Sequence, residues 1–350
     1  MSDMDLFKKM FFSVFDPKKN ERIVLLHDVP SRSVLDNVAW LERRRLLDDW
    51  YRYCLILGDD FNFDVEKVSF NATGGHNRKL NNDILLDLKK FNVIIAMTEF
   101  SATSSLVDFV RNNSDSIRCA SMPLAEKRMM NTVFSMDYSD VKRYAHGIKD
   151  LLQKAIAARV IFSTGHRLDV DIRFRDAGAD DGDCSRPGNF INLPSGEGFI
   201  APYEAEKDEM FVYGESKTNG VLPFYFKDEF VRGIVEKNKI VDFVCNDEIK
   251  KDLDLFFDMF VNRRNIAELG IGCNPNARVT GNFIEDEKAG LHIAYGGSSH
   301  LGGKINSDIH NDIVYAKNCP IYAESLFLFD EGGDGIEIVK KGVVQYDLLR

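Results

Sequence analysis

The first 160 residues alternate short apolar runs with segments of helical spacing. One helix is predicted to begin at Ser33, a residue type that caps helices. Two further helices are predicted at residues 84–88 and 104–110. Apolar runs of strand length occupy residues 23–26, 54–57 and 93–97. Strands that alternate with helices form parallel sheets, so this part of the chain is predicted to be an open, Rossmann-like α/β domain.

An amphipathic helix predicted at residues 141–156 separates this part from a strand-rich remainder. Residues 168–174 alternate strictly between apolar and polar side chains, as a half-buried strand does. The other predicted elements are a helix at residues 248–262 and strands at residues 211–213, 222–226, 234–236, 240–244 and 336–339. We therefore predict two domains, an α/β N-terminal domain over residues 1–160 and a mixed α+β catalytic domain over residues 161–350.

Composition and charge limit the partners of the chain. Its 350 residues carry a formal net charge of -10, whereas binding to nucleic-acid phosphates needs a concentrated basic surface. No apolar run of about 18 residues is present, and the N-terminus is acidic where a signal peptide is basic. The six cysteines show no pairing pattern. We expect a cytoplasmic protein with no nucleic-acid and no membrane partner.

The candidate metal-binding and catalytic residues lie in the second domain. In the first, Gly74-Gly75 leads into His76-Asn77 and not into a phosphate-binding motif. In the second, Glu268 lies within an apolar run, where an ionised carboxylate is costly to bury unless a cation neutralises it. His310 and Asp312 are two positions apart, so an extended segment places both on one face. Imidazole and carboxylate groups on a common surface are typical of divalent metal sites.

The same residues also allow purely structural roles. Glu268 could form a salt bridge with Arg263 or Arg264, and Glu197, at a loop-to-strand corner, could be solvated. His292 is flanked by apolar residues, as many buried, hydrogen-bonded histidines are.

Five segments of the second half follow one another in a recognisable order. They are residues 180–188, 192–202, 265–275 and 285–292, and the His-x-Asp of His310 and Asp312. Together they resemble the aminopeptidase T and aminopeptidase S family of two-metal aminopeptidases. The resemblance covers roughly residues 165–320.

The resemblance implies a metal-dependent aminopeptidase that removes N-terminal residues from small peptides. It implies two divalent ions, zinc, cobalt or manganese, with Glu268 as the bridging ligand. The implied ligands are Glu197, Glu268, Glu287, His292, His310 and Asp312, and Glu197 or Glu287 would accept a proton. A homodimer is also implied, because relatives of this fold close their sites by pairing.

Two departures from the family pattern bear on the activity. Relatives carry a Tyr seven residues past the position of His292, and here that position is Ser299, with His300 beside it as a candidate replacement. Relatives also often show a His within the segment matched by residues 101–105, which here reads Ser-Ala-Thr-Ser-Ser. Both departures bear on the identity of the substrate and on whether the chain hydrolyses peptides.

An alternative function comes from a second group of enzymes with similar segments. Mononuclear iron dioxygenases that open hydroxylated pyridine rings bind Fe(II) through two His and one Asp, with His where this chain has Glu268. The extra carboxylates of Glu197, Glu268 and Glu287 favour the two-metal hydrolase. A metal-binding homologue that has lost catalysis is a third hypothesis.

Overall fold

The computed structural model describes residues 2–349, and the chain divides into two compact units. The first contains Met1–Lys142, Asp180–Ser195 and Asn274–Ala277, and the second contains Arg143–Ala179, Gly196–Cys273 and Arg278–Arg350. The first unit therefore takes two short segments from the later part of the chain.

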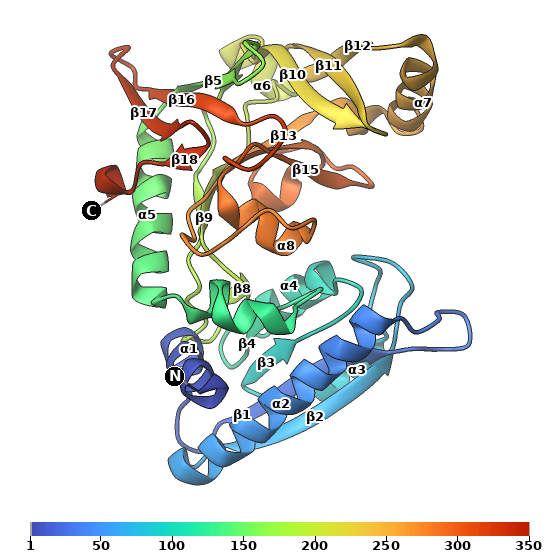
Figure 1. Cartoon of the computed structure of the whole chain (residues 1–350), viewed down its shortest axis with the longest axis vertical. Helices are drawn as coiled ribbons and strands as arrows, with labels where there is room; N and C mark the ends of the chain where they lie inside the picture. The colour runs from blue at the N-terminus through green and yellow to red at the C-terminus, as the bar shows by residue number, and fades with distance from the viewer. Residues whose placement is uncertain (1, 350) are drawn as a thin grey trace. The chain divides into compact units, whose positions relative to one another are not determined.

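The first unit is built on a five-stranded parallel sheet with the order β2-β1-β3-β4-β8 (Figure 1). Its strands are β1 (Arg22–Val29), β2 (Asp64–Asn71), β3 (Val93–Ala96), β4 (Arg118–Ser121) and β8 (Phe190–Asn192). Both central strands β3 and β4 are buried along their whole length, as expected of a parallel sheet covered on its faces. The predicted open α/β architecture is confirmed.

The helices of this unit are α1 (Asp3–Phe15), α2 (Val38–Phe61), α3 (Asn82–Leu88) and α4 (Thr103–Arg111). The sequence prediction missed α1 altogether. Its signal was present, because Ser2 and Asp5 form a capping box and Phe7, Phe11 and Val14 follow helical spacing on the buried face.

The predicted strand at residues 54–57 is wrong, because these residues belong to α2. Cys54 and Leu57 are buried while Leu55 and Ile56 are exposed, which is the three-residue spacing of a helix and not the alternation of a strand. The predicted start at Ser33 is also wrong. Asn37 caps α2 by accepting a hydrogen bond from the Trp40 backbone N–H at 2.8 Å.

The second unit contains two sheets. The larger has eight strands in the order β12-β11-β10-β6-β5-β16-β17-β18, and the smaller has five in the order β15-β14-β13-β9-β7. The strands of the larger sheet are β5 (Ala157–Phe162), β6 (Arg167–Asp171), β10 (Asn219–Phe226), β11 (Glu229–Glu236), β12 (Lys239–Val244), β16 (Ala323–Phe329), β17 (Gly335–Lys340) and β18 (Val343–Val344). The strands of the smaller sheet are β7 (Gly178–Asp180), β9 (Glu197–Ile200), β13 (Ile266–Gly272), β14 (Leu291–Gly296) and β15 (His310–Val314).

The remaining helices are α5 (Tyr138–Lys154), α6 (Lys207–Tyr213), α7 (Asp247–Asp258) and α8 (Phe283–Asp286). The helix predicted at residues 141–156 is confirmed as α5, and most predicted strands are present. The strand predicted at residues 211–213 is wrong, because this apolar run ends α6 and leaves Phe211 92% exposed. A three-residue apolar run has too few positions to distinguish the two periods.

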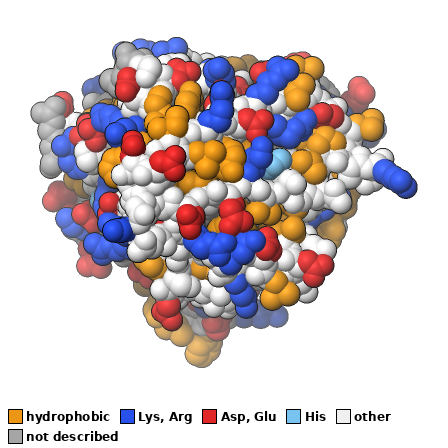
Figure 2. All heavy atoms as spheres, turned by 90° about the horizontal axis from the view of Figure 1, so that it is seen from below, with side chains coloured by type: hydrophobic (Ala, Val, Ile, Leu, Met, Phe, Trp, Pro, Cys, Tyr) orange, Lys and Arg blue, Asp and Glu red, His pale blue; other side chains and the backbone are white. Residues whose placement is uncertain are grey.

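The surface is charged and mixed. On the face shown in Figure 2, basic and acidic side chains are interspersed with apolar ones. Within residues 2–349, no helix combines the length and the apolar character that a membrane span requires.

Candidate metal centre

In the smaller sheet of the second unit, the neighbouring strands β9, β13, β14 and β15 carry five of the six candidate ligands. Glu197 begins β9 and Glu268 lies in β13, a strand buried on both faces. His292 lies in β14, opposite Gly270 of β13. A Cβ atom on Gly270 would lie 1.9 Å from the His292 Nε2 atom, so only glycine leaves room for this imidazole.

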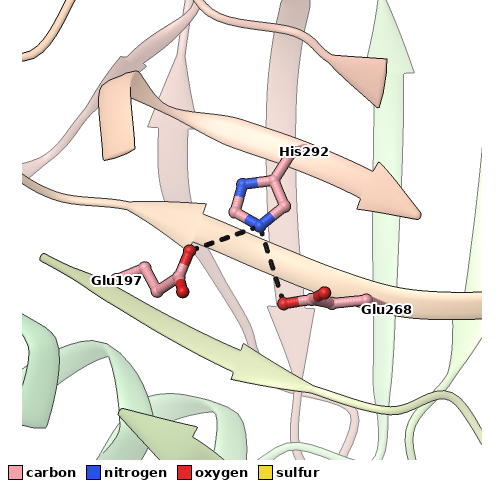
Figure 3. Close-up of side chains that lie close together, drawn as sticks. All are labelled: Glu197, Glu268 and His292. Atoms are coloured by element: carbon pink, nitrogen blue, oxygen red, sulfur yellow. Dashed lines mark ion pairs between the residues drawn. The ribbon is translucent and has the colours of Figure 1, made fainter. Parts of the chain in front are cut away.

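The first ligand group consists of Glu197, Glu268 and His292, all buried. The His292 Nε2 atom lies 3.5 Å from Glu197 Oε2 and 3.6 Å from Glu268 Oε1. In Figure 3 the imidazole points between the two carboxylates. These separations are long for hydrogen bonds and leave the three ligand atoms within 4.8 Å of one another.

The second ligand group consists of Glu268, His310 and Asp312. The His310 Nε2 atom lies 3.0 Å from Glu268 Oε2 and 3.7 Å from Asp312 Oδ1. Its other ring nitrogen, Nδ1, lies 2.7 Å from the Gly297 carbonyl oxygen, which orients the ring with Nε2 toward the carboxylates. Glu268 thus directs its Oε1 atom toward His292 of the first group and its Oε2 atom toward His310 of the second group.

Glu268 does not form the alternative salt bridge with Arg263 or Arg264. Arg263 donates to Asp308 at 2.9 Å, and Arg264 pairs with Asp254 and Asp258. The charged partners of Glu268 are the two imidazoles.

The shared carboxylate controls the protonation of both histidines. Burial disfavours a charged imidazole, but the neighbouring Glu268 carboxylate outweighs burial and raises the pKa of His292 to about 10 and that of His310 to about 9. Burial likewise opposes ionisation of Glu268, and the two imidazoles outweigh it and hold the pKa of Glu268 well below its ordinary value. Without a metal ion, Glu268 therefore favours the protonated form of both imidazoles.

The donor set fits divalent metal ions. Two imidazoles and three carboxylates suit zinc, cobalt, manganese or iron(II). The Oε2 atom of Glu197 is buried and has no hydrogen-bond partner among the described residues, so its lone pairs are available to a metal ion. Glu197, Glu268 and His292 would hold one ion, and Glu268, His310 and Asp312 would hold a second.

Glu287, the sixth predicted ligand, lies outside both ligand groups. Its Oε1 atom is 2.8 Å from the Nζ atom of Lys288, which is fully buried and also lies 2.7 Å from Glu197 Oε1. Burial, assisted by the negative charges of Glu197 and Asp312 and opposed by Lys288, raises the pKa of Glu287 to about 8. Glu287 can therefore exchange a proton near neutral pH.

Lys288 is the residue of this site that sequence reasoning missed. It follows Glu287 in a short turn and carries no pattern that separates it from a solvated lysine. By holding the Oε1 atom of Glu197, it leaves the Oε2 atom of the same carboxylate directed toward His292. Lys288 is thus a positioning residue for the first ligand group.

Replacing Lys288 with Met should destabilise the metal-free protein by about 3–5 kcal/mol, because the buried Glu197 carboxylate loses the cation that pairs with it. Divalent ions should restore part of this loss, since an ion neutralises Glu197. Denaturant unfolding in chelator and in added metal measures both effects. Lys251→Met, at an exposed position of α7, is the control and should change little. An unchanged unfolding free energy for Lys288→Met in chelator would contradict the role of the ammonium.

His300 lies beside the second ligand group but not within it. It is exposed in a short 3₁₀ turn (Ser299–Leu301), with its ring centroid 4.6 Å from that of His310 and the ring planes at 82°. The loop that carries it is anchored by Glu204, which accepts hydrogen bonds from the Ser298 hydroxyl and, at 2.7 Å, from the Lys304 backbone N–H. Arg175, also buried, donates to Glu204 at 3.1 Å.

The chain matches no protein-family model and no curated protein sequence. Two solved structures share its fold over nearly the whole length. One is 2,5-dihydroxypyridine dioxygenase from Pseudomonas putida KT2440, with 15% identity, 100% of each chain covered and a TM-score of 0.68. The other is wild-type AmpT from Thermus thermophilus, with 12% identity, 98% of each chain covered and a TM-score of 0.65.

These similarities establish the fold of the whole chain. At 12% and 15% identity they extend to the architecture and not to the reaction. The activity has to be argued from the side chains of the site.

Proposed function

We propose that the protein is a metal-dependent aminopeptidase that removes N-terminal residues from small peptides, with two divalent ions as cofactors. The observation that carries the proposal is the position of Glu268 between two ligand groups, with Oε1 toward His292 and Oε2 toward His310. A carboxylate with one oxygen in each of two adjacent groups suits a pair of ions better than a single ion. AmpT, a full-length structural neighbour, supports the same choice.

In such a centre, a pair of metal ions lowers the pKa of bound water from about 15.7 to about 7 and polarises a carbonyl group. The protein's own contribution is proton transfer and orientation. Glu287 is the candidate proton acceptor, because it lies outside both ligand groups. Burial raises its pKa in the metal-free protein, and bound cations would lower that pKa and favour the ionised form that accepts a proton. Glu197, the other candidate for this role, acts as a metal ligand in this proposal, because it belongs to the first ligand group.

His300 is a candidate for stabilising the oxyanion. It is exposed beside His310, and the Glu204 and Arg175 pair holds its loop, so an imidazole N–H is available at the edge of the centre. In the aminopeptidase family, a Tyr at the position of Ser299 would coordinate metal or fill this role.

The second candidate function is ring cleavage by a mononuclear Fe(II) dioxygenase. The full-length match to 2,5-dihydroxypyridine dioxygenase and the His310 and Asp312 pair favour it. A facial triad needs two His and one carboxylate. The second ligand group has one His and two carboxylates, His310, Asp312 and Glu268, because His292 belongs to the first ligand group. We therefore place the hydrolase first.

Metal analysis is the first test of the proposal. The purified protein should hold about two divalent ions per chain and hydrolyse aminoacyl amides and dipeptides without consuming oxygen. Oxygen uptake with hydroxypyridines, together with one iron per chain, would replace the aminopeptidase with the dioxygenase. Bound metal without turnover of either substrate class would identify a homologue that has lost catalysis.

A further inference from the structure

One edge of the smaller sheet carries two of the candidate metal ligands. β15, which contains His310 and Asp312, is the last strand on its side of the sheet and pairs only with β14. Every residue of β15 is partly or fully exposed. An edge strand presents unpaired backbone N–H and C=O groups, which can pair with another extended chain.

The other sheet edges are less open to such pairing. Among the strands of residues 2–349, the edge strands β7, β8 and β18 have three residues or fewer, and β2 and β12 contain Lys67 and Lys239. Short strands and lysines are common means of preventing edge-to-edge pairing. β15 has five residues without lysine or proline, and its one carboxylate belongs to the second ligand group. This edge is therefore suited to pairing with a further strand.

Hydrogen bonds at the two ends of β15 fix which of its residues bond to β14. The Gly297 N–H donates to the Ile309 carbonyl oxygen at 2.8 Å, and the Tyr315 N–H donates to the Leu291 carbonyl oxygen at 2.7 Å. Opposed residues of an antiparallel pair alternate between hydrogen-bonded and non-hydrogen-bonded pairs. In the register of β14 and β15, the odd-numbered residues of β15 are therefore the ones that bond to β14.

The even-numbered residues direct their backbone groups away from the sheet. These residues are His310, Asp312 and Val314, and no other hydrogen bond within residues 2–349 engages their N–H and C=O groups. Two of the three are candidate ligands, so the row of outward groups begins at the candidate metal centre. Because β15 starts at His310, only the direction toward Val314 offers further strand.

We infer that the edge of β15 binds the main chain of an extended peptide substrate, which adds to the sheet as a further, parallel strand. The inference rests on the proposed aminopeptidase function. A peptide main chain carries the N–H and C=O groups that complement the outward groups of β15, and strand addition of this kind binds a peptide through its main chain. The residues after the scissile bond run from Asp312 toward Val314.

Peptide length and N-methylation test the pairing. The metal-loaded protein should cleave penta-alanine at least about tenfold better in kcat/KM than L-alaninamide, because only the longer substrate reaches along β15. Successive N–H groups of a strand point to opposite sides. Of two analogues methylated on the amide nitrogen of the third or the fourth residue, one should therefore lose about tenfold and the other should stay within about twofold. Each analogue is the control for the other.

A variant of the edge gives a second test. Val314→Pro removes an outward N–H and no bond to β14, and edge strands tolerate proline at such positions. It should lower the ratio of penta-alanine to L-alaninamide hydrolysis about tenfold. Val241→Pro makes the same change at an exposed residue that a bulge leaves unpaired in the edge strand β12, and should leave the ratio unchanged. If Val314→Pro does not fold, the methylated peptides decide on the wild type.

The outcomes separate the edge from the chemistry. Hydrolysis with no preference for penta-alanine, or with equal sensitivity to both methyl groups, would overturn the edge inference and leave the aminopeptidase standing. If nothing is hydrolysed, amide hydrogen exchange of Asp312 and Val314 in chelator decides. Slower exchange with penta-alanine would keep the edge as a peptide site and remove the proposed function, and unchanged exchange would overturn the inference. Protection that needs no peptide and rises with protein concentration would place a second copy at the edge and also overturn it.

Discussion

Glu268→Gln should remove metal and activity together. Glutamine keeps the shape of the side chain but loses the charge that one oxygen presents to each ligand group. Losing about 4 kcal/mol of transition-state stabilisation lowers a rate about 1,000-fold, and a centre that holds neither ion should lose at least this much. Metal analysis and amide hydrolysis on the same preparation measure both effects.

The same variant has a readout that does not depend on activity. Because Glu268 is what raises the pKa values of His292 and His310, both should fall in the metal-free Glu268→Gln protein. NMR titration of the imidazoles in chelator would record the change. Glu204→Gln is the matched control, since Glu204 is equally buried but lies outside both ligand groups, and it should keep the wild-type metal content. Full metal content and activity in Glu268→Gln would refute the shared-ligand assignment.

His310→Ala and Asp312→Ala should each empty the second ligand group. Both side chains lie on the ligand face of β15, opposite Gly296 and Ala294 of β14. Each variant should therefore lose about one ion per chain and lower amide hydrolysis about 1,000-fold or more. The two residues also belong to the dioxygenase hypothesis, so the loss of metal tests the site without assuming the reaction.

The residue between them supplies the control. Asn311 faces the opposite side of β15, where its Nδ2 atom donates to the Tyr295 hydroxyl. Asn311→Ala should keep the wild-type metal content and most of the activity. If His310 were only a structural residue, its truncation would cost roughly 1–3 kcal/mol of stability and leave bound metal intact. Wild-type metal in both His310→Ala and Asp312→Ala would exclude the proposed centre.

Local periodicity was enough for the fold class and for many elements. Apolar runs and helical spacing predicted β1, β3 and α5, because these patterns report which positions of one element are buried. Periodicity failed where a segment was short. Residues 54–57 and 211–213 each offered too few positions to separate a helix from a strand, and both lie in helices.

The candidate site was only partly accessible from sequence. The two-residue spacing of His310 and Asp312 was sufficient to predict that they share one face of a strand, since strand geometry has a period of two. The apolar run around Glu268 indicated a buried carboxylate that needs a cation. Neither pattern could give the partners of Glu268 or the contact between the predicted ligand Glu287 and the buried Lys288.

The sequence alone was enough to predict an α/β chain of two domains, with a set of acidic and histidine residues in the second domain. Burial, alternation and capping are properties of neighbouring residues, so one sequence suffices to find them. Only the tertiary structure decided that Glu268 faces two imidazoles and that Lys288 is a buried cation between two carboxylates. These facts depend on the register of β9, β13, β14 and β15, which pairs residues as far apart in the sequence as Glu197 and Gly272, and no local pattern encodes that register.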